Sequence, residues 1–439
     1  MKISALGSIG LVGCWDVKPR NGNLSFPINV KSNMTTGHLI MSAMKGVASE
    51  ALETETLIVG GGVAGFSAAN SIANKDYVLV EMDDDFGGTS GAVSINNNQY
   101  SQGAHYDLSY PRHYGNSVIE LLEKMEVTSF DSLKNEHCFQ DSKYLINQTN
   151  EEICFNGNAF QESPLINNAN KQDFISLMQS YVGEMTMPTR LIKEKHRHLN
   201  QLTFFEFINK YIVHDPQLIS GIDYQMMDDY GGNCSQVSAL AGVHYYACRD
   251  YYGDSKPQTF SPPEGNYYFI KKLQEQLNSE SLRKSSLVFK IEQKGNKYES
   301  LVYNTITSKI TKIISSKVVY AGQKNALKYI YPKYANLFDN NVYAPWVVIN
   351  FELKNSIEQD PKWQNDMLNV QPNLLGFVNS RAQYAKDKVL TMYLCFDSAD
   401  RKELMQVLAK PEVIIQNALN NLEKYYGKNV EEHIESAHV

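Results

Sequence analysis

The stretch 56–88, TLIVGGGVAGFSAANSIANKDYVLVEMDDDFGG, carries the signal that decides the fold. A β-branched run ends in three glycines, a small-residue segment follows, and a second apolar run ends in an acid. This order predicts a strand over 56–59, a helix over about 63–74 and a second strand over 77–81. We therefore expect a β–α–β unit with a glycine turn between its first strand and its helix.

The glycine turn has the spacing GxGxxG at Gly60, Gly62 and Gly65. The first glycine allows a tight turn, the second leaves room for a pyrophosphate, and the third lets the helix pack against the strand. The helix N-terminus at Val63 and Ala64 then offers N–H groups and partial positive charge to the phosphate. The motif predicts a dinucleotide site.

An acid at the end of the second predicted strand extends this motif. Glu81 follows Gly60 by roughly 20 residues, where a carboxylate accepts the ribose hydroxyls of an adenosine. The same carboxylate would repel a 2′-phosphate, so NADP is disfavoured. The pair Gly87 and Gly88 beyond it resembles the flavoprotein extension of this fold, and a plain NAD dehydrogenase has no need of it. The acidic run 83–85 is interpreted as a solvated turn.

Composition restricts the class of protein. The chain has 439 residues with 43% hydrophobic and 20% charged residues, values of a soluble globular protein with about two or three domains. A formal net charge of −7 argues against nucleic acid or anionic lipid as the main partner. None of the six cysteines forms a CxxC pair, which disfavours a zinc ribbon or a redox dithiol. The run EKHRH (194–198) is not HExxH, and we expect a solvated helix face there and no metal site.

The N-terminal run MKISALGSIGLVGC resembles the end of a bacterial lipoprotein signal, in which Cys14 would be lipidated. It is too short to span a bilayer. We expect a true start upstream and export of the folded protein to the periplasmic side of a bacterial cell envelope. The alternative is a disordered leader with a chance cysteine in a cytoplasmic protein.

Further segments complete the outline of the fold. Residues 15–50 predict an arm across the surface, 115–215 mostly helix, and 266–277 and 400–427 amphipathic helices. The runs SLVFKIEQKGNKYESLVYN (286–304) and KVVYAGQ (317–323) look like a β-meander and a returning strand, or alternatively an ordinary hairpin. Strands interleaved with helices predict an α/β fold with an inserted mixed domain.

The chain resembles the FAD-dependent amine oxidase and phytoene desaturase superfamily, and more narrowly its exported bacterial FAD-dependent oxidoreductases. The matching pieces span roughly residues 50–400: VGGGVAGFSAA, GGTSGA, QGAHYDLSYP, DDYGGNCSQVSALAGVHYYACR, SPPEGNYYFIKKL and YAPWVVINFEL. The resemblance implies an α/β protein with a three-layer, Rossmann-like FAD-binding domain and an interleaved mixed α+β substrate domain. The expected division is a leader at 1–14, an arm at 15–50, FAD-binding parts at 51–110 and 271–325, and substrate-domain parts at 111–270 (mostly helical) and 326–439.

The resemblance also assigns residues to FAD. It implies that a loop around Gly103 approaches the flavin ring, that the backbone of Val288 meets the adenine, and that the returning strand passes the cofactor. Thr89 and Ser90 stand where the family usually has an arginine after its glycine pair. The cofactor-binding residues are expected to be Gly60, Gly62, Val63, Ala64, Gly65, Glu81, Gly87, Gly88, Thr89, Ser90, Gly103, Ala104, His105, Val288, Ala321 and Gly322.

A dense polar and aromatic stretch over 226–253 supplies candidates for a substrate cavity, since acids suit a cationic amine and aromatic faces cradle it. Buried structural polar residues are the alternative. Glu264 in the PPEG segment is expected beside the cavity or as a helix cap. The cavity candidates are Asp228, Asp229, Tyr230, His244, Tyr245 and Tyr246. The catalytic candidates are His105, Tyr106, His244 and Lys324, the last, like Lys328, by position only.

The expected function is hydride transfer from an organic substrate, an amine in the first place, to FAD. Oxygen or a membrane quinone would reoxidise the flavin. A desaturase or isomerase of an apolar substrate is the alternative enzyme. The superfamily ends in a glycine-rich segment that covers the flavin, and the sequence up to NVEEHIESAHV contains no such segment. A truncated flavoprotein without catalysis is therefore the alternative outside enzymes.

Overall fold

The computed structural model describes residues 24–41, 46–72, 76–103, 111–147, 152–166, 168–248, 258–359, 361–383, 386–397 and 401–439. The expected lipid attachment at Cys14, and the flavin-loop candidates Ala104, His105 and Tyr106, lie outside these ranges. Within them, no helix is both long and apolar enough to cross a membrane.

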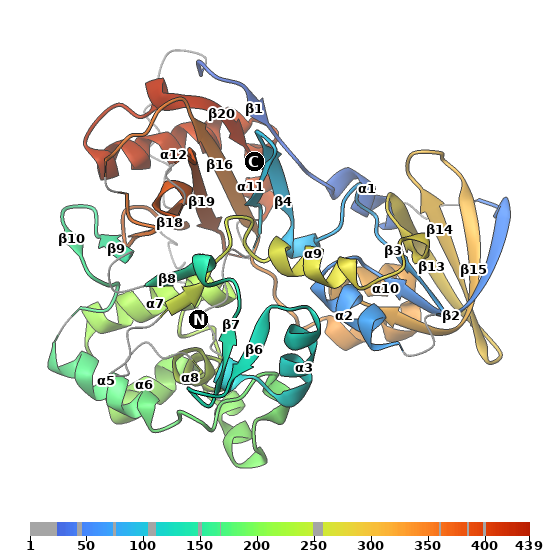
Figure 1. Cartoon of the computed structure of the whole chain (residues 1–439), viewed down its shortest axis with the longest axis horizontal. Helices are drawn as coiled ribbons and strands as arrows, with labels where there is room; N and C mark the ends of the chain where they lie inside the picture. The colour runs from blue at the N-terminus through green and yellow to red at the C-terminus, as the bar shows by residue number, and fades with distance from the viewer. Residues whose placement is uncertain are drawn as a thin grey trace, which may run out of the picture.

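A six-stranded sheet forms the predicted nucleotide-binding part, with the order β12-β3-β2-β15-β14-β13. Its strands β12, β3, β2 and β15 pair in parallel, whereas β14 and β13 continue as an antiparallel meander. Both the β–α–β unit and the meander with its returning strand are confirmed (Figure 1). The strands are β2 (Glu50–Val59), β3 (Tyr77–Val80), β12 (Leu282–Arg283), β13 (Ser286–Lys294), β14 (Lys297–Asn304) and β15 (Ile310–Tyr320).

Helices cover both faces of this sheet, as a three-layer fold requires. On one face α2 (Val63–Ser71) and α9 (Tyr267–Glu275) bury Phe66 and Ile270 against the strands. On the other face α10 (Leu327–Ile330) packs Ile330 into a separate apolar cluster. The first strand begins six residues earlier than predicted, and the first helix ends three residues earlier, at Ser71.

A second sheet of eight strands has the order β1-β20-β16-β19-β18-β17-β9-β10. The predicted runs after residue 342 form its centre, whereas its last strand, β20, was not predicted. The strands are β1 (Ile28–Asn29), β9 (Glu152–Phe155), β10 (Phe160–Gln161), β16 (Trp346–Leu353), β17 (Gln364–Met367), β18 (Leu374–Asn379), β19 (Val389–Cys395) and β20 (Ile434–His438).

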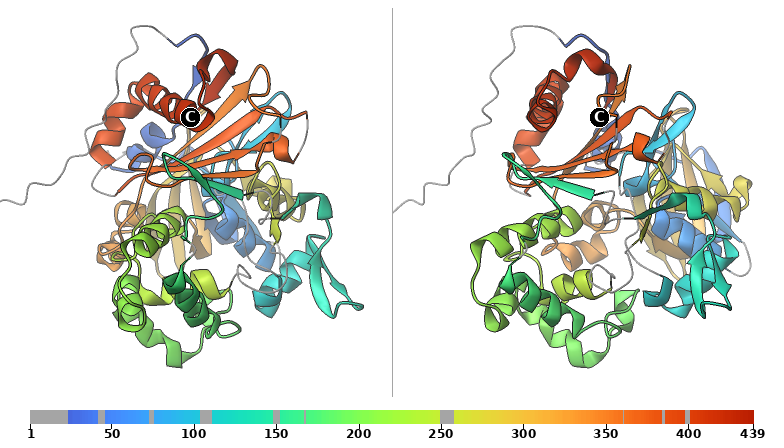
Figure 2. Two further views of the ribbon diagram at one scale, coloured as in Figure 1. Left: turned by 90° about the vertical axis from the view of Figure 1, so that its left-hand side faces the viewer. Right: turned by 60° about the vertical axis from the view of Figure 1, so that its left-hand side comes forward.

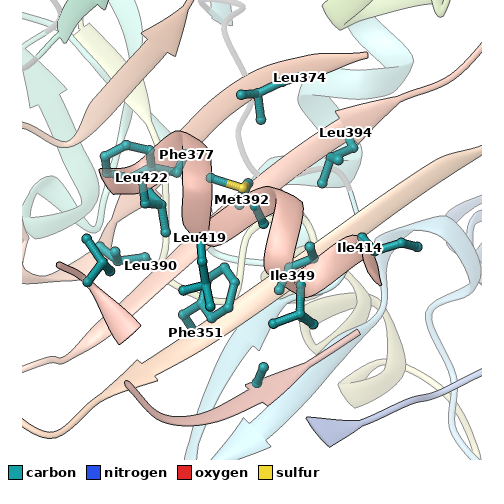
Figure 3. Close-up of a cluster of buried hydrophobic side chains, with 14 of the residues drawn as sticks. Ile349, Phe351, Leu374, Phe377, Leu390, Met392, Leu394, Ile414, Leu419 and Leu422 are labelled. Atoms are coloured by element: carbon teal, nitrogen blue, oxygen red, sulfur yellow. The ribbon is translucent and has the colours of Figure 1, made fainter. Parts of the chain in front are cut away.

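The two faces of this sheet differ in chemistry because side chains alternate along each strand. On β16, Ile349 and Phe351 face α12 (Pro411–Tyr426), which lies across the sheet and buries an apolar core with it (Figures 2 and 3). The alternate residue Asn350 bonds instead to the hairpin of β4 (Ala92–Ile95) and β5 (Asn98–Ser101) on the opposite face. A further helix, α11 (Arg401–Leu408), packs on α12.

A helical lobe lies against that opposite side of the eight-stranded sheet (Figure 2). Its helices begin at residues that cap them: Thr203 forms a capping box with Glu206, and Asp215 accepts the N–H groups of Gln217 and Leu218. The lobe has its own core, so it can hold its shape next to the sheet. Its helices are α5 (Ala169–Gln179), α6 (Phe204–Tyr211), α7 (Pro216–Tyr230) and α8 (Ala239–Ala247).

The prediction that residues 115–215 are mostly helical is wrong for the described residues of 128–161. There the chain forms short strands, several of which pair with partners far away in sequence, such as β9 with β17. Non-local pairing leaves no helical or long alternating pattern to read. The strands and the preceding helix are α3 (Asn116–Lys124), β6 (Thr128–Asp131), β7 (Glu136–Phe139) and β8 (Leu145–Asn147), the last paired with β11 (Gln258–Phe260).

The described part of the predicted arm joins the two sheets. Its strand β1 pairs with β20 at the edge of the eight-stranded sheet. A few residues later, Asn33 donates to the carboxylate of Asp83, beside the six-stranded sheet, just before α1 (Met34–His38). These described residues of the predicted arm thus run from one sheet to the other, and the acidic turn is a contact point for the arm.

Candidate functional site

The glycine turn is shaped by close backbone approaches. Gly60 has φ +108°, and a Cβ there would lie 3.0 Å from the carbonyl oxygen of Ala321. At Gly65 a Cβ would lie 1.8 Å from the carbonyl oxygen of Gly60, closer than any two such atoms can come. The returning strand, the turn and α2 therefore meet at a point where only glycine fits, as GxGxxG requires.

The N-terminus of α2 has the features of an anion-binding site. Gly62 is its N-cap, and no side chain among the described residues caps it. The first N–H groups of the helix, including those of Val63 and Ala64, have no acceptor within the helix, so they can bind a phosphate. Gly62 also pairs with Gly87, and a Cβ at Gly62 would lie 3.5 Å from the Gly87 carbonyl oxygen.

Glu81 joins the two loops that surround this helix end. Its carboxylate is buried and accepts the N–H groups of Gly61 at 2.6 Å and of Asp83 at 3.0 Å. Each oxygen keeps a second lone pair, so the carboxylate can still accept ribose hydroxyls. The structure thus gives Glu81 a role that the sequence did not predict, which is to fix the glycine turn.

The glycine pair lies directly against the turn. Gly87 and Gly88 have φ +134° and +55°, and the N–H of Gly87 donates to the carbonyl of Gly61. A Cβ at Gly103 would lie 1.9 Å from the carbonyl oxygen of Thr89. The structure therefore brings the predicted residues from 60–65, 87–90 and 103 together in one place.

The distant meander also reaches this place, as predicted. Ala321 donates its N–H to the carbonyl of Val59 at 2.8 Å, directly before the glycine turn. At the other end of the meander, Ser286 donates to the carbonyl of Glu81 at 2.7 Å, which places Val288 two residues from the predicted ribose site. Gly322 follows Ala321, and a Cβ there would lie 3.0 Å from the ring of Tyr320.

Sequence reasoning missed Gly61 and Phe86 in this site. A Cβ at Gly61 would lie 2.5 Å from the Phe86 ring, and that ring contacts Phe66 of α2 at a centroid distance of 5.1 Å. Phe86 therefore packs between the glycine turn and α2. The sequence did contain a sign of this role: residues 60–62 are all glycine, although the motif requires glycine only at 60 and 62.

Asp228 is the substrate-cavity candidate whose charge reaches the eight-stranded sheet. It lies in the last turn of α7, and its charge acts on Tyr393 and Cys395 of β19. Burial raises the pKa of Tyr393, a hydrogen bond with Ser101 lowers it, and Asp228 raises it further. Burial and the same carboxylate raise the pKa of Cys395 to about 12. Tyr393 thus interacts both with Asp228 of α7 and with Ser101, which lies two residues before Gly103.

The other cavity candidates lie deeper in the helical lobe. Tyr246 is 1% exposed, donates to Gln225 at 2.5 Å and packs edge-on against Phe174 at 4.8 Å. Tyr245 is equally enclosed and stacks edge-on with Tyr246. For these two residues the structure favours the alternative of structural core residues.

The polar ends of α7 and α8 complete this region. Tyr230 donates its hydroxyl to the carbonyl of Ala241, which joins the two helices, and Asp229 beside it is exposed. His244 is half-buried on α8, with Nδ1 3.8 Å from the sulfur of Cys248. Tyr230 thus joins the two helices two residues after Asp228.

The lysine candidates do not converge on this region. Lys324 is exposed, and its ammonium lies 5.4 Å from the centre of the Phe338 ring. Lys328 is likewise exposed, with its ammonium over Tyr329. Glu264 is buried and forms an ion pair with Lys271, whereas Asn266 is the N-cap of α9, so Glu264 does not cap that helix.

A buried carboxylate that the sequence did not suggest lies between α7 and the eight-stranded sheet. Asp366 of β17 accepts hydrogen bonds from Tyr224 of α7 at 3.0 Å and from Gln364 at 2.8 Å. Burial raises the pKa of Asp366 to about 6, although both hydrogen bonds oppose the shift. The hydroxyl of Tyr224 also contacts the carbonyl of Leu375, so this group fixes α7 to the sheet.

A surface pocket of about 390 Å³ lies at the tip of the β4–β5 hairpin. It is lined by charges of both signs, among them Glu352, Lys354 and Asp387. Tyr100 reaches it from β5, and burial together with the charge of Asp387 raises the pKa of Tyr100 to about 12. The pocket contains none of the predicted cofactor or substrate residues.

Comparisons with known proteins agree with this geometry. The model of the NAD(P)-binding Rossmann-like domain matches residues 58–124, which include the glycine turn, Glu81 and the glycine pair. No curated protein matches the chain in sequence.

Solved structures show the same overall fold at low sequence identity. A putrescine oxidase variant aligns with a TM-score of 0.62 at 14% identity, covering 87% of this chain and 83% of its own. A fatty acid isomerase from P. acnes aligns at 0.61 and 14%, covering 87% and 85%. Cyclohexylamine oxidase from Brevibacterium oxydans aligns at 0.59 and 12%, covering 88% and 84%. The chain thus contains a match to the NAD(P)-binding Rossmann-like domain, and it shares its overall fold with solved amine oxidases.

Proposed function

We propose that this protein is an FAD-dependent oxidoreductase. The observation that carries the proposal is the convergence of four separate segments, 60–65, 81–90, 103 and 321, around the uncapped N-terminus of α2. A Rossmann-like domain alone serves many cofactors, but the added glycine pair and the meander at its edge suit the longer FAD molecule. When bound, FAD would accept a hydride from the substrate.

The residues present fit that cofactor. The helix end and the glycine turn would hold the pyrophosphate, and Glu81 would accept the ribose hydroxyls. Val288 would meet the adenine, and the backbone of Thr89 and Ser90 would take the place of the arginine common in the superfamily. Gly103 would let the following loop come close to the flavin ring. In this arrangement the protein binds and orients the cofactor chiefly through its backbone.

For the substrate we propose a cationic amine bound near the end of α7. Support comes from the carboxylate of Asp228 and from the aromatic and apolar groups that its charge reaches on β19, Tyr393 among them. In a site shielded from water, a carboxylate attracts an ammonium group more strongly than it does in solution. Oxygen or a quinone as electron acceptor, and a location in the cell envelope with a lipid on Cys14, are further proposals from the sequence.

The visible absorption spectrum of the purified protein tests the cofactor proposal. We expect flavin bands, or their appearance with protein-bound character when FAD is added. A folded protein that stays colourless, and does not quench flavin fluorescence at any FAD concentration, would contradict the proposal.

Replacing Glu81 by glutamine should weaken FAD binding by roughly tenfold to a hundredfold, since one charge-assisted hydrogen bond contributes ~1.5–3 kcal/mol. The amide nitrogen of glutamine would face a backbone N–H, of Gly61 or of Asp83, where the carboxylate now accepts. Fluorescence titration with FAD measures the Kd. The control is Glu53→Gln, the same change at an exposed residue whose contact is an ion pair with Lys297. Equal affinity of Glu81→Gln and the wild type would exclude this role of Glu81.

Adding amines anaerobically to the FAD-loaded protein tests the substrate proposal. We expect at least one diamine or alkylamine to bleach the flavin, and Asp228→Asn to slow the bleaching by about tenfold or more, because a charge partner of the ammonium group is lost. If every amine leaves the flavin oxidised while another class of substrate reduces it, the amine proposal is wrong and the oxidoreductase proposal stands.

A further inference from the structure

A chain of buried hydrogen bonds connects the eight-stranded sheet to the predicted flavin loop. Asn350 of β16 is 0% exposed, accepts the hydroxyl of Thr391 at 2.7 Å and donates to the carbonyl of Ser101 at 3.0 Å. The hydroxyl of Ser101 in turn donates to the carbonyl of Gly103 at 2.9 Å. The chain runs from β19 through β16 to the end of β5.

Packing alone does not require these polar side chains. Val389 of β19, which lies on the same face of the sheet as Asn350, is buried and apolar and packs on Ile95 and Tyr100 of the hairpin. A buried amide stabilises a protein only when its donors and acceptors are satisfied, and an apolar residue of similar volume usually serves a core at least as well. Among the described residues, Asn350 is the one through which β16 bonds to the segment 101–103.

The loop that Asn350 holds reaches the dinucleotide site by direct contact. Gly103 is so close to Thr89 that no side chain fits between them. Thr89 belongs to the short helical turn Gly88–Ser90, which follows the pairing of Gly87 with Gly62. A shift of Ser101 and Gly103 would therefore be passed to the loop that flanks the N-terminus of α2.

We propose that Asn350 is a positioning residue, which sets the cofactor loop from the substrate side through Ser101 and Gly103. Asn350 lies on β16 and acts on the loop through Ser101, Gly103 and Thr89, so it does not need to contact the cofactor. The inference rests on the proposed function, because it concerns the geometry of the site that would hold FAD.

Replacing Asn350 by alanine tests the proposal. The substitution leaves the Ser101 carbonyl and the Thr391 hydroxyl without their amide partner, and we expect the Kd for FAD to rise about tenfold, the equivalent of one hydrogen bond. The control is Asn365→Ala on β17 of the same sheet. Asn365 is 1% exposed and donates to the carbonyl of Lys362, so its loss costs similar stability far from the loop. We expect its FAD affinity to equal that of the wild type.

The variant Asn350→Asp adds a second measurement, the pH dependence of FAD affinity, which a purely structural role of Asn350 would not change. A buried aspartate has a raised pKa. When protonated, it can donate to the Ser101 carbonyl as asparagine does, whereas the carboxylate form repels it. The FAD affinity of Asn350→Asp should approach that of the wild type near pH 5 and fall below it by pH 8. The described titratable groups around this position, present in every variant, are Glu352, Tyr393, His438 and Tyr100.

The outcomes separate the inference from the function on which it rests. If the wild type binds FAD and Asn350→Ala binds it equally well, the positioning role is wrong and the cofactor proposal stands. If Asn365→Ala weakens binding as much as Asn350→Ala, general destabilisation of the sheet explains both, and the role is wrong. If the wild type binds no FAD, both proposals fall. Ser101→Ala, a smaller change on the loop itself, provides the same test should Asn350→Ala not fold.

Discussion

Replacing Gly65 by alanine should weaken FAD binding by at least a hundredfold, the equivalent of about 3 kcal/mol. The added Cβ would lie 1.8 Å from the carbonyl oxygen of Gly60 and 3.6 Å from the Cβ of Ala321. The first of these contacts involves backbone, which cannot rotate away as a side chain can. Either α2 moves away from the strand or the turn opens, and both displace the N–H groups that would bind the pyrophosphate.

The expected destabilisation by Gly65→Ala is opposite to the usual effect of replacing glycine by alanine in a helix. Within an ordinary helix, glycine to alanine stabilises by up to ~1 kcal/mol. The matched control is Gly37→Ala in α1, where the new Cβ would lie at an ordinary 3.8 Å from the Cε of Met82. Fluorescence titration with FAD and thermal unfolding should show a large loss for Gly65→Ala and none for Gly37→Ala. Full FAD affinity in Gly65→Ala would mean that the cofactor does not bind at this turn.

The sequence predicted this part of the protein well because glycine spacing has a direct geometric cause. A residue that must adopt a φ as far from the usual range as the +108° of Gly60, or whose Cβ would overlap backbone, as at Gly65, is restricted to glycine. The contact of Ala321 with the turn was predicted only through the resemblance, since nothing local in 317–323 points to residue 60.

The rest of the site escaped prediction where the same residue types serve a core or a cavity equally well. The aromatic residues of 244–246 suggested a cavity, but Tyr246 packs against Phe174 inside the lobe. The strands within 128–161 depend on distant partners, as in the pairing of β9 with β17, and their residues carry no local sign of it. Asp366 lies in a short polar run, and only the packing of α7 makes it a buried acid.

Replacing Asp366 by asparagine should stabilise the protein at pH 8 by ~2–3 kcal/mol, because a pKa shift of one unit is equivalent to ~1.4 kcal/mol. Burial raises the pKa of Asp366 from 3.8 to about 6. The folded state therefore keeps a proton that the unfolded state releases between these two values. The stability that this group contributes is fully present below pH 3.8 and is lost as the pH rises through about 6.

Denaturant unfolding at several pH values measures this effect. Between pH 4 and pH 8 the wild type should lose ~2–3 kcal/mol more than Asp366→Asn, whose amide oxygen still accepts from Tyr224 and Gln364 and does not ionise. The same substitution at Asp339, which is exposed, is the control and should leave the pH dependence unchanged. Parallel pH curves for the wild type and Asp366→Asn would show that Asp366 does not titrate in this range.

A second variant tests the same carboxylate in the opposite direction. The hydroxyl of Tyr224 donates to Asp366 and thereby lowers its pKa, so Tyr224→Phe should raise the pKa further and move the loss of stability to higher pH. The two substitutions thus have opposite effects on one titration, which a general loss of packing between α7 and the sheet would not produce. α7 ends at the proposed amine site. The ionisation of Asp366 at high pH, which destabilises the contact of α7 with the sheet, should therefore also lower the affinity of the wild type for the amine. Asp366→Asn should keep its amine affinity at high pH.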